Sequence, residues 1–80
     1  MDYRKKLVVC DENVLGYINL RNETTLWIFR SLITKGAMLT FSDSMPVNLF
    51  KTIRLATEQD FDYFRVSSVG FFDDPEFIHA

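Results

Sequence analysis

The chain has 80 residues, the size of one small domain whose hydrophobic core is limited. Hydrophobic residues make up 48% of it and eight are phenylalanine, so the composition excludes intrinsic disorder and exceeds what so small a domain easily buries. The net charge of −2 conceals a split, because residues 1–56 carry eight Lys/Arg against five Asp/Glu, whereas residues 57–80 carry one against six. The two parts either pair with each other or leave an acidic face for recognition.

We expect the chain to open with a β-hairpin. The β-branched, apolar run that ends residues 5–10 is typical of a strand. Residues 11–13 are predicted to form a turn, because Asp and Asn tolerate tight backbone geometry. Residues 14–20 then alternate between two faces and return as the second strand.

The main helix is predicted over residues 23–35. Asn22 is a favourable N-cap, Lys35 suits the last turn, and Gly36 is a natural residue just beyond a helix end. At 100° per residue one helix face is apolar; it consists of Leu26, Ile28, Phe29, Leu32 and Ile33. The sheet residues expected to face this helix are Leu7, Val9, Ile18 and Phe41.

The second half of the chain is predicted to add strands at residues 37–41 and 51–56. Residues 57–66 allow two interpretations, a short helix capped by Thr57 or a strand, because periodicity cannot decide for so short a segment. The elements together predict an α+β fold in a single domain, residues 1–80. An antiparallel β-sheet of three to five strands would pack on one main α-helix.

The sequence offers little for catalysis. It has one histidine, His79, and one cysteine, Cys10, so it cannot assemble the clusters used for nucleophile activation or transition-metal binding. Its glycines are twenty or more residues apart, which argues against a phosphate-binding loop. Cys10 lies between Val9 and Asp11 and is interpreted as a small buried hydrophobe. We therefore expect no enzyme activity, no cofactor and no metal site.

The location is expected to be cytoplasmic, in a cell or an infected host cell. No apolar run approaches the ~20 residues of a membrane span, and a lone cysteine agrees with a reducing compartment. We therefore expect no membrane contact. Direct nucleic-acid binding is not expected either, because the basic cluster at residues 4–6 is short and has no interleaved aromatic residues.

The aromatic surplus and the lack of catalytic motifs favour a small module that binds another protein. We expect an inhibitor or modulator of that protein, of the kind found among phage and mobile-element accessory proteins. A homodimer would also bury the surplus apolar surface. One alternative is an acidic DNA mimic. If Glu58, Asp60 and Asp62 lie on a strand, their spacing of about 6.6–7 Å is near twice the rise of duplex phosphates. A minor structural or assembly subunit is the other alternative.

The candidate partner-binding residues form two groups. Trp27 falls among the polar residues of the predicted helix, where another part of the chain covers the ring or the ring is exposed as an anchor. The first group comprises Trp27, Arg30, Ser31 and Lys35. The second group lies in the acidic part of the chain, residues 57–80, and comprises Glu58, Asp60, Asp62, Asp73 and Asp74.

Overall fold

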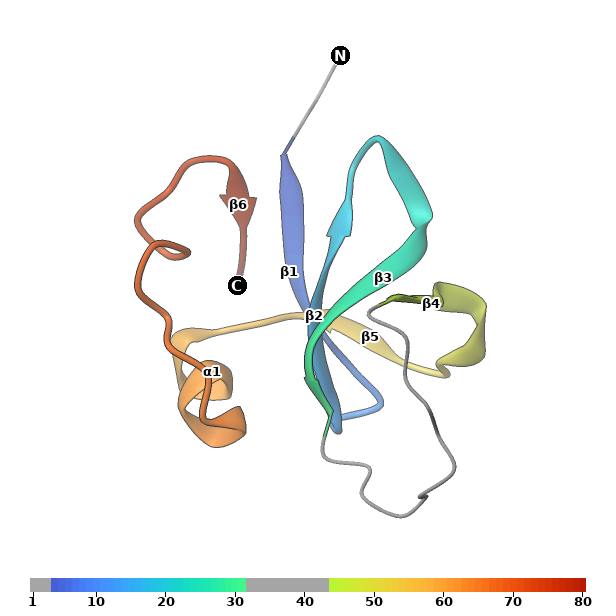
Figure 1. The fold of residues 1–80 in the computed structure, drawn as a ribbon, viewed down its shortest axis with the longest axis horizontal. Coiled ribbons are helices and arrows are strands. Elements are labelled where there is room, and N and C mark those ends of the chain that lie inside the picture. Colours follow the sequence, from blue (N-terminus) through green and yellow to red (C-terminus); the bar gives the residue numbers. More distant parts are fainter. Residues whose placement is uncertain (1–3, 32–43) are drawn as a thin grey trace.

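The structure is a computed structural model that describes residues 4–31 and 44–80 (Figure 1). Its elements in chain order are β1 (Lys5–Cys10), β2 (Val14–Asn19), β3 (Asn22–Ser31), β4 (Ser44–Pro46), the 3-10 turn η1 (Val47–Leu49), β5 (Ile53–Leu55), α1 (Glu58–Phe64) and β6 (Phe77–Ile78). The strand order is β4-β3-β2-β1-β5, antiparallel throughout, and β6 adds a short parallel pairing to β1. The fold is thus α+β in the broad sense, with strands dominating.

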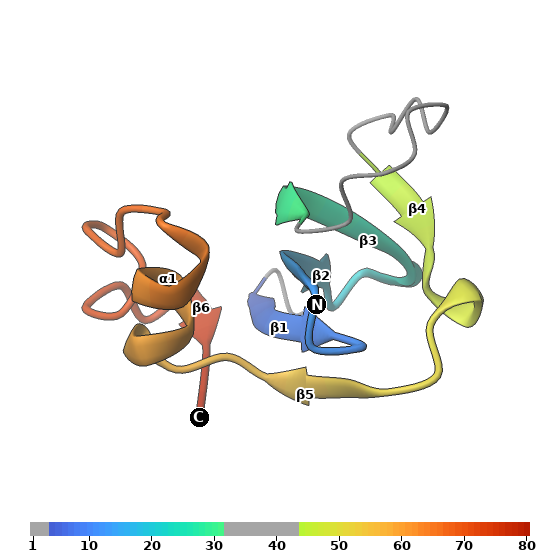
Figure 2. The same ribbon diagram turned by 90° about the horizontal axis from the view of Figure 1, so that it is seen from below.

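Strand β1 is an interior strand of the sheet, with partners along both edges. One of its edges pairs with β2 along its full length. Its other edge is shared, since β5 pairs with Val8–Cys10 and β6 pairs with Lys5 and Lys6. Figure 2 shows α1 and β6 on one side of β1 and β4 on the other. Because both faces are covered, four consecutive residues from Leu7 to Cys10 are buried.

The core lies on both faces of the sheet. On the face covered by α1 and the C-terminal segment, the buried residues are Leu7, Val9, Leu15, Ala56, Phe61 and Phe64. On the opposite face, where η1 and β5 contribute, they are Val8, Cys10, Val14, Ile18 and Leu26. Leu7, Val9, Ile18 and Leu26 are buried as expected, but they do not share one helix-covered face, because Leu7 and Val9 belong to the first cluster and Ile18 and Leu26 to the second. Phe29 is half-buried and packs on the first of these clusters.

The predicted helix at residues 23–35 is wrong, because Asn22–Ser31 forms strand β3. Its middle is rich in β-branched and aromatic residues, which fit a pleated surface better than a helix. Asn22 does not cap a helix; its side-chain oxygen accepts hydrogen bonds from the Thr24 amide and hydroxyl at the start of the strand. Lys35, Phe41 and the strand predicted at residues 37–41 lie outside the described residues.

Other predicted elements agree with the structure. The opening hairpin is confirmed as β1 and β2, joined by a tight turn in which Asp11 and Glu12 both have positive φ. The strand predicted at residues 51–56 is present in a shorter form as β5. Residues 58–64 are helical, and the side chains of Thr57 and Asp60 form the reciprocal bonds of a capping box.

A bulge in β3 depends on Gly16. Leu15 pairs with Arg30 and Gly16 with Ile28, so Phe29 is an extra residue on β3. The backbones approach so closely here that a Cβ at position 16 would meet the carbonyl oxygen of Trp27. Only glycine fits this position of β2 without moving the neighbouring strand.

We predict that Gly16→Ala lowers the free energy of unfolding by about 2–3 kcal/mol, because the added methyl group would push β3 away from β2. Urea denaturation followed by circular dichroism measures this change. Gly70→Ala is the comparison, since Gly70 has a φ of 89° but open space around it, so its cost is limited to about 1 kcal/mol of backbone strain. Equal effects of the two substitutions would contradict the close approach at Gly16.

Candidate interaction surface

Trp27 is partly exposed on the sheet, with 39% of its surface accessible. It stands on β3 directly across from Tyr17 on β2, and the two rings stack with centroids 6.5 Å apart and planes 20° apart. Of the two interpretations for this residue, the structure therefore agrees with exposure. The reason differs from the expected one, because the ring stands on a sheet face and not among the polar residues of a helix.

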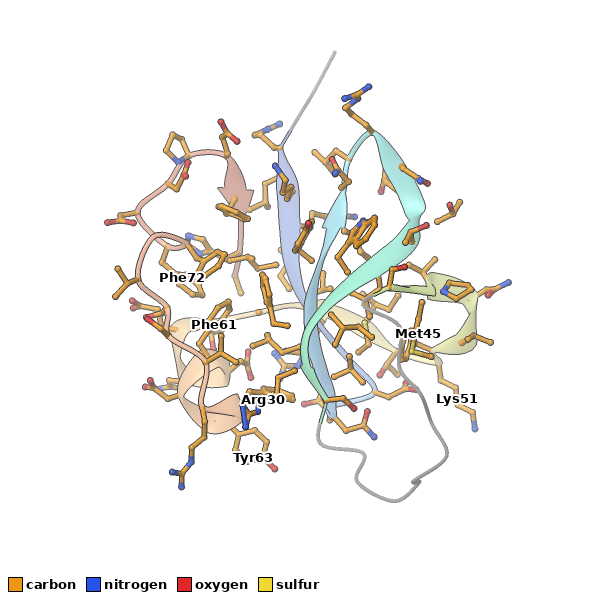
Figure 3. All side chains as sticks on the ribbon, viewed as in Figure 1. Arg30, Met45, Lys51, Phe61, Tyr63 and Phe72 are labelled. Carbon is orange, nitrogen blue, oxygen red and sulfur yellow. The ribbon has the colours of Figure 1, made fainter. Side chains whose placement is uncertain are left out.

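The Trp27 ring is the first of a continuous row of aromatic side chains that contact one another. Tyr17 contacts Phe29 at 5.5 Å between ring centroids, and Phe29 contacts Phe61 of α1 at 5.9 Å. Phe61 in turn meets Phe72 edge-on at 5.0 Å, and Figure 3 shows these two side chains next to each other. Trp27 is thus the accessible end of a packed aromatic row, which limits the motion of the ring.

The other residues of the first group are dispersed. Arg30 is exposed near the end of β3, and Figure 3 shows it directed toward α1 and the exposed Tyr63. Ser31 is half-buried and pairs with Val14 on β2. Lys35 lies outside the described residues. The structure therefore does not bring Arg30 and Ser31 together with Trp27 in the way a single helix face would.

Asp60 of the second group is bound within the protein. The Arg54 guanidinium on β5 lies between two carboxylates, bonding Asp60 through two contacts of 2.8 Å and Glu12 through contacts of 2.8 and 2.9 Å. Asp60 also accepts a hydrogen bond from the Thr57 amide at 2.8 Å. The Arg54 guanidinium is the main cause that lowers the pKa of Asp60 to about 2, and hydrogen bonds from the amide and hydroxyl of Thr57 contribute less. Both carboxylates raise the pKa of Arg54, and Arg54 lowers that of Glu12.

The remaining acidic residues lie around α1 and the segment that follows it. Glu58 and Asp62 are exposed one helical turn apart on α1. Glu58 and Asp73 line the same hollow, which has a volume of about 750 Å³. Asp74 has a local role, since its side-chain oxygen accepts a hydrogen bond from the Glu76 amide at 2.9 Å. Three carboxylates, those of Glu58, Asp62 and Asp73, thus remain as recognition candidates.

Cys10 and His79 both take part in packing within the described residues. Cys10 is fully buried in β1, and this burial, together with neighbouring Asp11, raises its pKa to about 12. His79 stacks on Phe72 with ring centroids 4.5 Å apart. Within residues 4–31 and 44–80, no group of three or more His, Cys, Asp or Glu could hold a metal ion. No helix in this same part of the chain is long and apolar enough to cross a membrane.

Comparison of the chain with protein-family models, curated protein sequences and solved structures found no match. The site is therefore defined by its geometry. Sequence reasoning missed Tyr17 and did not single out Arg54 as the partner of Asp60, although both residues have a local signal. Tyr17 occupies the same strand face as Leu15, and Arg54 lies six residues before Asp60 at the start of the acidic part.

We predict that Asp60 makes the domain sensitive to acid. A carboxylate whose pKa is lowered on folding stabilises the protein above its unfolded pKa of about 4, and this contribution is lost as the pH falls toward 2. The difference in unfolding free energy between the wild type and Asp60→Asn should therefore shrink by about 2 kcal/mol as the pH falls from 6 to 2. Urea denaturation at several pH values measures the difference. Asp62→Asn, which removes an exposed carboxylate from the same helix, should show no such convergence.

Cys10 should not react in the folded protein. The raised pKa leaves almost no thiolate at pH 8, and the strand buries the sulfur. We expect a thiol reagent such as dithionitrobenzoate to label Cys10 only at the rate of unfolding, and rapidly in urea. Rapid labelling without denaturant would show that β1 opens locally.

Proposed function

We propose that this chain is a small, non-enzymatic module that binds another protein and modulates or inhibits it, with Trp27 as the anchor of the contact surface. The observation that supports the proposal most directly is the exposed ring of Trp27 stacked on Tyr17. Tryptophan is among the residues that most often dominate binding energy at protein interfaces. A ring held by a packed aromatic row also loses little conformational freedom when a partner covers it.

The alternative of DNA mimicry loses its geometric basis. It required Glu58, Asp60 and Asp62 to repeat along one face of a strand, but these residues lie on α1. The Asp60 carboxylate is also neutralised by Arg54 at 2.8 Å. We therefore propose that the chain binds its partner protein through Trp27, and not by placing these carboxylates in the nucleic-acid-binding site of another protein.

We predict that Trp27→Thr weakens partner binding at least about 30-fold, which corresponds to the 2 kcal/mol or more of an interface anchor. Threonine retains the preference for a strand, so the loss of the cross-strand aromatic pair should change stability by no more than about 1 kcal/mol. Proteins captured from the source cells by the wild type and by the variant are compared by quantitative mass spectrometry. The affinity is then measured with the purified partner.

The matched control is Tyr63→Ala, which removes another exposed aromatic side chain, 68% accessible, from α1. Tyr63→Ala should retain the proteins that Trp27→Thr loses. Equal loss with both variants would indicate adhesion to apolar surface in general. Sedimentation of the wild type tests the homodimer, and a dimer that Trp27→Thr dissociates would make a second copy the partner.

A further inference from the structure

The hollow beside α1 combines negative charge with an aromatic wall. It lies where the start of α1, the segment around residues 68–73 and the C-terminal end of the described chain meet. Its volume of about 750 Å³ is within the range of ligand-binding pockets. The lining residues that matter here are Glu58, Val69, Gly70, Phe72, Asp73 and His79.

The two carboxylates of the hollow are not neutralised within the described residues. No hydrogen bond or ion pair in residues 4–31 and 44–80 engages the side chain of Glu58 or Asp73. The only Lys or Arg among residues 57–80 is Arg65. The hollow therefore presents two exposed carboxylates that can attract a cationic ligand.

The wall of the hollow suits a flat, delocalised cation. Phe72 is fixed between two rings, that of Phe61 at 5.0 Å and that of His79 at 4.5 Å. Val69 is 85% exposed and provides an apolar surface at the rim. A guanidinium group stacks on aromatic faces and bonds carboxylates through two parallel contacts, whereas an ammonium group is a point charge.

The described residues contain an example of this chemistry. Arg54 lies between Glu12 and Asp60 and bonds each of them through two contacts. The hollow is lined by two further carboxylates, those of Glu58 and Asp73, and no arginine is among its lining residues.

We propose that this hollow binds an arginine side chain presented by a partner protein, with Glu58 and Asp73 holding the guanidinium and Phe72 and Val69 contacting its flat face and alkyl chain. The identity of the ligand as part of a partner rests on the proposed function. The affinity of the hollow for a guanidinium does not, and it can be measured without any partner.

The test uses the full chain labelled with ¹⁵N and the peptide acetyl-Gly-Arg-Gly-amide as the probe. Two further peptides carry citrulline, which is neutral and nearly the same shape, or lysine in place of arginine. We expect saturable chemical-shift changes at Val69, Gly70 and Asp73 with the arginine peptide, several-fold weaker binding of the lysine peptide, and no saturable change with citrulline.

Glu58→Gln and Asp73→Asn should each weaken binding of the arginine peptide about tenfold or more, the loss of one charge-assisted contact. Asp62→Asn is the matched control, because it removes the same charge from the exposed surface of α1 outside the hollow. It should leave the affinity within about twofold. Urea denaturation confirms that each variant is folded.

Three results would overturn the proposal: equal shifts with the citrulline peptide, no saturation with any peptide, or equal weakening by Asp62→Asn. Equal affinity for the lysine peptide would overturn the preference for a guanidinium. Loss of peptide binding with intact capture through Trp27 would leave the proposed function standing, and the reverse outcome would leave the hollow as an arginine site alone. The two proposals can therefore fail separately.

Discussion

The rest of the structure depends on the burial of both faces of β1. Its apolar residues alternate in direction, so Leu7 and Val9 enter one core cluster while Val8 and Cys10 enter the other. A single layer of packing cannot cover both sets. The α1 helix with the C-terminal segment closes one face, while η1 and β5 help to close the other. The backbone of β1 is paired along both edges. A small domain gains two modest clusters in place of one large core.

Arg54 joins the parts that cover β1. The turn after β1 provides Glu12, the start of α1 provides Asp60, and the guanidinium of β5 bonds both. Glu12 has a positive φ, which is unfavourable for a residue with this side chain. The ion pair with Arg54 gives a reason why glutamate occupies this position of the turn. Asp11 of the same turn accepts hydrogen bonds from the Lys51 and Thr52 amides, which fixes the approach to β5.

The two proposed contact regions are the ends of one aromatic row. Trp27 is accessible at one end, and Phe72 with His79 borders the hollow at the other. Between them, Tyr17, Phe29 and Phe61 pack ring against ring. Several aromatic residues are thus used inside the domain, and the row is accessible at Trp27 and borders the hollow at Phe72.

The sequence by itself determined the features whose signals are local. The hairpin of β1 and β2, the turn between them and the burial of Cys10 all follow from neighbours a few residues apart, whereas the sequence left residues 57–66 open between a helix and a strand. Only the tertiary structure decided that Asn22–Ser31 is a strand, because the pairing with β2 and β4 outweighs the end signals of a helix. The engagement of Asp60 and the hollow at Glu58 and Asp73 were likewise decided by segments distant in sequence, since the partners of a surface charge depend on how the chain packs.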